Sequence, residues 1–522
     1  MSLIDRLARR LGFQRVSARQ SYVGGAVNRL MQDWIRAPLS ADRELEVDML
    51  RLRARSRDAV RNNGYARRFV RMAQLHIVGP RGIRARPCNR IGDRPHDALN
   101  DEIARGWREW GRPGSASTDG RLSWLELQHL AVSEVYQSGE ALVQIVLDPA
   151  HPHGISLNPI DADRLDERLS RRAGPGSNEI RYGVELDGVG RPVAYHILSQ
   201  HPSDTARIGG GVAVTRVPAD QIIHMMDTTE RVGRTRGVPR LAVALRDLRH
   251  LDGAQEASLV AMRTAASAVG VVVTKDPNAE VSTPVAGATL GVEPGLFPYL
   301  DVGQELQSWS PHAPSDNYPD FTKAVLRGVA SGLGTNYAQL AGDLSDANMS
   351  SMRVGRAEEQ EGWMAAQEWM IEHFCQRVYD AWLRAAALAG AIRVPAYDIA
   401  RASAVMWQPR RWASPKPTED IEADERRVAL GVMSRQMVAA RDGVDIWEVW
   451  EQLAEESAYA DRLQLNVEPP RKAAGVQPNE PTDTASDGAA SGDEYHDGTG
   501  SGSGRGRHAD DRRVLRVTRA AI

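Results

Sequence analysis

The stretch GVPRLAVALRDLRHLDGAQEASLVAMRTAASA, residues 237–268, decides the fold because mixed α and β patterns give way there to a long helical one. Its apolar residues recur at helical spacing, at positions 238, 241, 245, 248, 251, 259 and 262. Gly237 and Pro239 suit a helix start, and Gly253 could mark a bend. A continuous helix would be about 48 Å long. It would either fold against its own domain or expose apolar surface that neighbouring subunits cover.

Beyond this helix, β-rich and helical patterns alternate. Residues 271–311 predict short strands and turns, and residues 320–334 predict a second, shorter helix. A polar stretch, NYAQLAGDLSDANMSSMR (336–353), precedes a long helical pattern over 351–390. Large apolar residues share one face of that helix, which favours core packing: they are Trp363, Met370, Phe374, Val378 and Trp382.

Before residue 237 the patterns are mixed. Residues 41–76 predict a helix that Asn62-Asn63-Gly64 breaks in two. Residues 122–139 have helical spacing, and Gly139 is placed to end that helix. Strands follow between 140 and 226, with a hairpin turn at Asp187-Gly188. The fold class we expect is therefore α+β and helix-rich.

The end of the chain differs from the rest. Residues 418–440 and 444–465 predict two more helices, whereas the sequence from 469 is rich in Pro, Gly, Ser and Asp. That composition predicts a disordered tail. The 522 residues leave room for about two to four domains. The two cysteines, Cys88 and Cys375, form no CxxC pair, which argues against a disulfide framework or a cysteine-based zinc site.

Charge is unevenly distributed. Residues 1–90 hold 20 arginines and 7 acidic residues, a net charge of +13, although the whole chain carries −3. Such a region could face nucleic acid or an acidic partner, or it could be a solvated, salt-bridged helical surface. Both interpretations stay open. No apolar run is long enough to span a membrane, so no membrane partner is expected.

Catalytic motifs are missing from the sequence. It has no GxSxG, HExxH or GxGxxG after a strand, and none of its four lysines lies in a Walker A motif. The best enzyme candidate is an Mg²⁺ site of Asp343 and Asp346 with Glu358 or Glu359 beyond them. Asp, Asn and Ser at this density are also typical of turns and helix caps, and Ser350 or Ser351 could cap the next helix. We therefore expect no catalytic residue, metal or cofactor.

Several stretches in this order resemble the portal proteins of tailed bacteriophages, and the lambda-type portal family most. The resemblance covers roughly residues 20–465, and Met349 departs from it because the family usually has a tyrosine there. The stretches that carry it are RARSRDAVRNNGYARRFV (53–70), GIRARP, Trp107/Trp110, SGEALVQIV (138–146), GRPVAYHIL (190–198), HMM with RVGRTRGVPRLA (224–242), LGTNYAQLAGDLSDANMSSMR (333–353) and RWASPKPTEDIEADERRVALGVMSRQMVAARDG (411–443).

The resemblance implies a ring of about twelve subunits at one capsid vertex. It also implies a division of the chain: 1–40 N-terminal arm, 41–236 wing α/β domain, 237–270 first stem helix, 271–318 clip, 319–335 second stem helix, 336–352 tunnel loop, 353–400 long wing helix, 401–468 crown and 469–522 disordered tail. The clip would meet the terminase and later the head-completion protein.

The tunnel loop would line the channel without holding DNA. Its expected DNA-contacting residues are Asn336, Tyr337, Gln339, Asp343, Ser345, Asp346 and Asn348, and its expected hinge residues are Gly332, Gly334 and Gly342. Fixed cations would bind phosphates and retard sliding, and no lysine or arginine lies between Arg327 and Arg353. Amides and hydroxyls would make weak contacts, while the carboxylates would repel the DNA backbone.

The resulting hypothesis is a non-enzymatic portal through which DNA is packaged and ejected. The implied partners are further copies of the chain, the terminase large subunit, the major capsid protein, head-completion or neck proteins, and double-stranded DNA without sequence specificity. The protein would be assembled in the host cytoplasm and reside in the virion, at the portal vertex. The alternatives are a metal-dependent DNA-processing enzyme that uses the Asp-rich loop, and a head–tail adaptor ring.

Overall fold

The computed structural model describes residues 38–91, 94–204, 212–267, 271–274, 304–307, 318–345, 348–394, 399, 402–412, 417–441, 444 and 446–465. The predicted tail, most of the predicted arm and clip, and Asp346 lie outside these residues. The chain divides into two units, residues 1–451 and 452–522. None of the described helices is long and apolar enough to cross a membrane.

The first helical segment breaks at Asn63, as the sequence predicts, and also at residues 47–48, where no break was predicted. The elements are α2 (Ala41–Glu46), α3 (Met49–Asn62), α4 (Gly64–Ala73) and a π-helical turn, Gln74–Val78. Asn63 is extended, and its side-chain oxygen accepts hydrogen bonds from the N–H groups of Tyr65 and Ala66. Asn63 thus ends one helix and caps the next.

Small antiparallel sheets follow, as the strand patterns predict. One has the order β10-β4-β5 and another β6-β7-β8-β9, and β1 pairs with a strand late in the chain, β13 (Val405–Gln408). The elements from 84 to 226 are β1 (Arg84–Pro87), β2 (Arg90–Ile91), β3 (Arg94–Pro95), α5 (Asp97–Trp110), α6 (Trp124–Ser138), β4 (Glu140–Leu147), β5 (Ile155–Ile160), β6 (Glu179–Arg181), β7 (Val184–Leu186), β8 (Pro192–Leu198), β9 (Val214–Pro218) and β10 (Ile222–Met226).

Local chemistry explains both ends of α6 and one hairpin turn. Ser123 and Glu126 form a capping box at the start of α6. Gly139 ends α6 with φ +91°, as its position predicts. The predicted hairpin joins β7 to β8, and the Asp187 carboxylate accepts hydrogen bonds from two backbone N–H groups in its turn.

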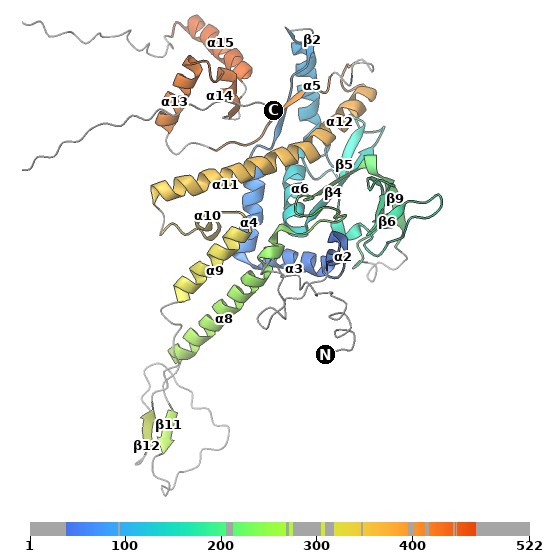
Figure 1. Ribbon diagram of the computed structural model, residues 1–522. Helices are drawn as coiled ribbons and strands as arrows, with labels where there is room; N and C mark the ends of the chain where they lie inside the picture. Colours follow the sequence, from blue (N-terminus) through green and yellow to red (C-terminus); the bar gives the residue numbers. More distant parts are fainter. Residues whose placement is uncertain are drawn as a thin grey trace, which may run out of the picture. The chain divides into compact units, whose positions relative to one another are not determined.

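The remaining elements run from the long helix to the C-terminal helices (Figure 1). They are α8 (Leu245–Ser267), β11 (Val271–Thr274), β12 (Gln304–Gln307), α9 (Tyr318–Gly332), α10 (Tyr337–Ala341), α11 (Met349–Met370), a π-helical turn (Ile371–Cys375), α12 (Gln376–Leu388), β13 (Val405–Gln408), α13 (Pro417–Ala429), α14 (Arg435–Arg441) and α15 (Ile446–Leu463).

The aromatic stripe predicted on the long C-terminal helix is core. Phe374 and Trp382 are fully buried. Trp107 lies 5.1 Å from Trp382 between ring centroids, and Trp124 lies 5.2 Å from Phe374. The α11–α12 helix therefore packs its apolar face on α5 and α6 around one main core.

The long helix at 237 starts later than the sequence predicts. Residues 240–243 form a 3-10 turn, and α8 begins only at Leu245. A helix from Gly237 was expected, but this residue is held against another segment: a Cβ added to it would lie 2.1 Å from the carbonyl oxygen of Gly139. The close backbone approach keeps these residues out of the helix.

Candidate functional site

The polar segment after α9 is more ordered than the predicted loop. The Asn336 side-chain oxygen accepts a hydrogen bond from the N–H of Ala338 at 2.9 Å and caps α10. The irregular part begins only at Gly342. Because α11 begins at Met349, Ser350 and Ser351 lie inside that helix, and the expectation that one of them caps it is wrong.

Asp343 is bound within this segment. Its carboxylate accepts hydrogen bonds from the Tyr337 hydroxyl at 2.8 Å and from the Ser345 hydroxyl and N–H at 2.6 and 3.0 Å. Lys323 Nζ lies 3.8 Å from the same carboxylate. The Ser345 and Tyr337 hydrogen bonds hold the pKa of Asp343 well below its usual range. Its charge is therefore partly compensated inside the protein rather than fully presented to a ligand.

Cations from other elements lie against the segment. Arg68 Nε on α4 donates to the Gln339 carbonyl at 2.6 Å, and the Arg327 guanidinium lies 5.4 Å from the Tyr337 ring centroid. The sequence shows no lysine or arginine between Arg327 and Arg353, but the fold supplies positive charge from outside that interval. Arg68 could not be found from spacing, because it lies 271 residues from Gln339.

The three predicted hinge glycines differ in conformation. Gly334 and Gly342 have φ values of +67° and +71°, which side chains rarely adopt. Gly332 is the last residue of α9 and shows no such requirement. The backbone conformation therefore favours glycine only at Gly334 and Gly342, and not at Gly332.

Two contacts fasten the segment to α11. A Cβ on Gly355 would lie 2.6 Å from the Asn336 side-chain nitrogen, so the missing side chain leaves room for that amide. Thr335 Oγ1 donates to Glu359 Oε1 at 2.7 Å, and Trp363 Nε1 lies 3.3 Å from the same oxygen.

The predicted DNA-contacting residues differ in exposure. Ser345 and Asn348 are exposed, while Asn336, Tyr337, Gln339 and Asp343 are half-buried.

The expected metal ligands do not converge in the described part of the segment. Asp343 is bound to Ser345 and Tyr337, and Glu359 is buried beside Thr335. Among the described residues, three possible ligand groups come together only at Asp161, Asp163 and His201.

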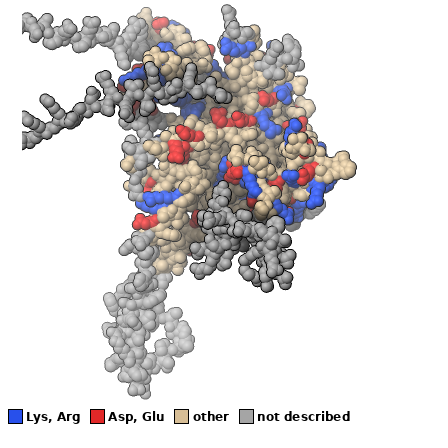
Figure 2. Space-filling model, in the orientation of Figure 1, with Lys and Arg blue, Asp and Glu red and all other residues tan. Residues whose placement is uncertain are grey.

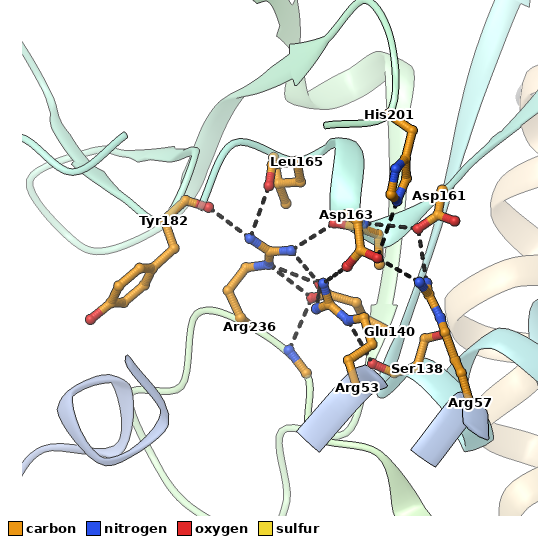
Figure 3. Close-up of polar contacts among 12 residues, drawn as sticks. Arg53, Arg57, Ser138, Glu140, Asp161, Asp163, Leu165, Tyr182, His201 and Arg236 are labelled. Carbon is orange, nitrogen blue, oxygen red and sulfur yellow. Dashed lines mark hydrogen bonds and ion pairs between the residues drawn. The ribbon is translucent and has the colours of Figure 1, made fainter. Parts of the chain in front are cut away.

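That cluster belongs to a larger ionic network around Glu140 (Figure 3). Arg236 Nη2 donates to Glu140 Oε1 at 2.6 Å, and Arg53 Nη2 donates to the same oxygen at 2.7 Å. The other oxygen lies 3.0 Å from His224 Nε2 and accepts the Gly237 N–H at 2.9 Å. Glu140 and Arg236 side chains are fully buried.

In the outer part of the network, arginine side chains bind the carboxylates of Asp161 and Asp163. Asp163 accepts from Arg53 Nη1 at 2.6 Å and from Arg57 Nη1 at 2.5 Å. Arg57 Nη2 also donates to Asp161 at 2.8 Å, and His201 Nε2 lies 3.4 Å from Asp163. A metal ion would have to displace these guanidinium groups, so the geometry fits an ionic lock better than a metal centre.

The network fixes the charge state and position of its centre. Burial by itself would raise the pKa of Glu140, but Arg236 and Arg53 hold that pKa well below its usual range. Arg236 also donates to the carbonyls of Ala162, Leu165 and Tyr182. The network thus ties the segment before α8 to β4 and α3.

Sequence reasoning missed this network, although a signal was present. Arg53, Glu140 and Arg236 each lie in a stretch that carries the family resemblance, namely 53–70, 138–146 and 224–242. The stretches are far apart in the sequence and meet in one cluster (Figure 3). The available sign was Glu140, a carboxylate that directly precedes the apolar run ALVQIV and would therefore need a buried partner.

Comparisons with known proteins agree on one family. The family model for phage portal proteins of the lambda family matches residues 27–367. A probable portal protein of Halomonas phage phiHAP-1 is 28% identical over 433 residues, covering 81% of this chain and 83% of that protein. Portal protein B of Escherichia phage lambda is 22% identical over 500 residues, with 85% and 90% covered.

Among solved structures, the chain is similar to a chain from the neck of a native GTA particle computed with C12 symmetry. The TM-score is 0.45 at 16% sequence identity, and the match covers 78% of this chain and 95% of that one.

Proposed function

The chain belongs to the lambda family of phage portal proteins, and we propose that it forms the ring-shaped channel at one capsid vertex through which DNA is packaged and ejected. Portal proteins are structural proteins of the phage rather than enzymes, in agreement with the prediction of a non-enzymatic protein. The observation that carries the proposal is this family membership, which spans the α/β body, α8, α9 and the polar segment.

In this proposal the chain keeps the division predicted from the sequence. Residues 237–270 and 319–335, which contain α8 and all of α9 except its first residue, are the stem. Residues 271–318 are the clip that docks the terminase and then the head–tail connector proteins. Residues 353–400 are the long wing helix, and 401–468 are the crown. The order of the elements and the contact between α8 and α9 support this division (Figure 1).

The segment 336–352 lines the constriction and touches DNA weakly. Ser345 and Asn348 are exposed and uncharged, which favours exchangeable contacts with any sequence. Lys323 is drawn toward Asp343 and Ser345, so its charge is partly compensated within the protein. A segment of this kind would give passing phosphates no strong, fixed site.

The ionic network holds the base of α8 while DNA moves. Arg236 and Gly237 stand eight or more residues before α8 and are bound directly to Glu140 of the sheet. A load on the stem therefore reaches the α/β body through buried, charge-assisted hydrogen bonds.

A packaging assay tests this function. Purified protein should bind the terminase large subunit, and proheads assembled with it should take up DNA when terminase and ATP are added. Rings that bind head-completion protein but no terminase would instead support the head–tail adaptor. Metal-dependent cleavage of DNA by the chain alone would contradict the proposal and favour the enzyme.

A further inference from the structure

The long helix carries a row of exposed acidic side chains on one side. The row consists of Glu358, Glu361, Glu368 and Glu372, the last in the π-helical turn that continues α11. Their spacing places them along one face. Within the described part of the chain, none of the four has a hydrogen bond or ion pair. Figure 2 shows acidic side chains along α11 on the visible face.

A cavity of about 650 Å³ lies beside this acidic face. Gly362 and Ala365 of α11 line it, together with Glu359, Asp227 and Glu230. Glu359 is only 7% exposed, and its Oε2 has no hydrogen-bond partner among the described residues. A buried carboxylate oxygen without a donor is unfavourable, so the site points to a missing donor.

The cation in the cavity wall is already engaged. Arg240 Nη2 lies 2.5 Å from Asp227 Oδ2, and another of its nitrogens lies 4.0 Å from Glu230. Burial raises the pKa of Glu359, although hydrogen bonds from Thr335 and Trp363 act in the opposite direction. The cavity and the adjoining face therefore favour a basic partner.

The same chain presents basic side chains on other helices. Arg55 and Arg61 on α3 and Arg67 and Arg71 on α4 are exposed, and none of their side chains has a hydrogen bond or ion pair within the described residues. Arg67 and Arg71 are one turn apart, so they share a face of α4. Helix α4 contains no acidic residue that could neutralise them.

We propose that the acidic face of α11, with the Glu359 cavity beside it, receives the α4 arginines of a second copy of the chain. The inference rests on the proposed ring, in which two different surfaces of each subunit must meet head to tail. The acidic face of α11 and the exposed arginines of α3 and α4 supply that complementarity. An acidic helix face would repel DNA, which favours protein over nucleic acid as its partner.

Charge reversal tests the pairing in the full-length protein. The double variants are Arg67→Glu with Arg71→Glu, and Glu361→Arg with Glu368→Arg. Each double variant should lower the affinity between subunits about tenfold, because attractive contacts become repulsive. The quadruple variant should recover assembly.

Mass photometry and sedimentation velocity measure the ring fraction, and circular dichroism checks folding. Arg105→Glu with Arg108→Glu on α5 is the matched control and should assemble normally.

The outcomes separate this inference from the proposed function. A wild-type protein that forms no ring contradicts the proposed function itself. Wild-type rings with unchanged assembly of both double variants overturn the inference alone, as does a folded quadruple variant that stays monomeric. Normal rings of the arginine double variant with reduced DNA retention would assign that face to DNA and also overturn the inference.

Discussion

Arg236 and Glu140 form a fully buried ion pair, with Nη2 of the arginine 2.6 Å from Oε1 of the glutamate. The pair joins the segment before α8 to the first residue of β4. It is shared with Arg53 of α3, so three parts of the sequence depend on one carboxylate. The position of the proposed stem therefore rests on a contact that no local pattern reveals.

Removing one member of this pair should be strongly destabilising. Arg236→Ala leaves Glu140 and Arg53 as an incompletely compensated buried group, so we expect a loss of about 3–5 kcal/mol in the free energy of unfolding. Urea denaturation followed by circular dichroism measures the loss. Arg246→Ala is the control, since this exposed arginine pairs with the half-exposed Asp247 and its loss should cost less than about 1 kcal/mol. Equal losses in the two variants would contradict the importance of the network.

Two glycine substitutions should have opposite effects. Gly237→Ala places a Cβ 2.1 Å from the Gly139 carbonyl oxygen and should reduce stability by at least about 2 kcal/mol. A Cβ added at Gly253 would have no other atom within 4 Å. Because Gly253 lies inside α8, Gly253→Ala should stabilise the folded protein by about 0.5–1 kcal/mol. Thermal unfolding of both variants checks the signs. A neutral Gly237→Ala would mean that the close approach of the two segments is absent.

Stability should fall in acid partly through Glu185. Hydrogen bonds from Arg216 lower the pKa of Glu185 to about 2, from an ordinary value of 4.5. A depressed carboxyl pKa stabilises the folded state above the unfolded pKa, and this contribution is lost as pH falls from about 4.5 to about 2. Glu185→Gln should therefore show a shallower loss of stability over this window than wild type. Parallel curves of unfolding free energy against pH would show that Glu185 does not contribute.

Positive charge in the proposed channel segment should slow packaging. Asp346→Lys adds a cation that can hold phosphates, so the packaging velocity should fall, more at low salt than at high salt. Asp343→Asn is the control for the hydrogen bonds to Ser345 and Tyr337, because it alters them without adding a cation. Unchanged velocity in the lysine variant at low salt would count against a channel role for this segment.

Periodicity and capping predicted several of the helices, but the single helix predicted over 418–440 is wrong, because α13 ends at Ala429 and α14 begins at Arg435. The break at Asn63, the end of α6 at Gly139 and the buried aromatic stripe of α11–α12 all follow from local residue types. The start of α8 was wrong by eight residues because Gly237 is fixed by contacts with Gly139 and Glu140, which lie far away in the sequence.

The polar segment also has contacts with distant residues that local patterns could not predict. Its residue types correctly indicated turn and capping chemistry, since Asn336 caps α10 and Asp343 accepts hydrogen bonds from Ser345. Its surroundings could not be predicted, because Arg68 reaches it from α4 and Glu359 anchors it from α11. Local patterns describe what a segment can form, and distant residues decide which charges it faces.

Electron microscopy of the purified full-length protein, with rotational classification, tests the central claim most directly. We expect closed rings of about twelve subunits around an open central channel. A population that stays monomeric or dimeric at low salt and high protein concentration would contradict the portal ring.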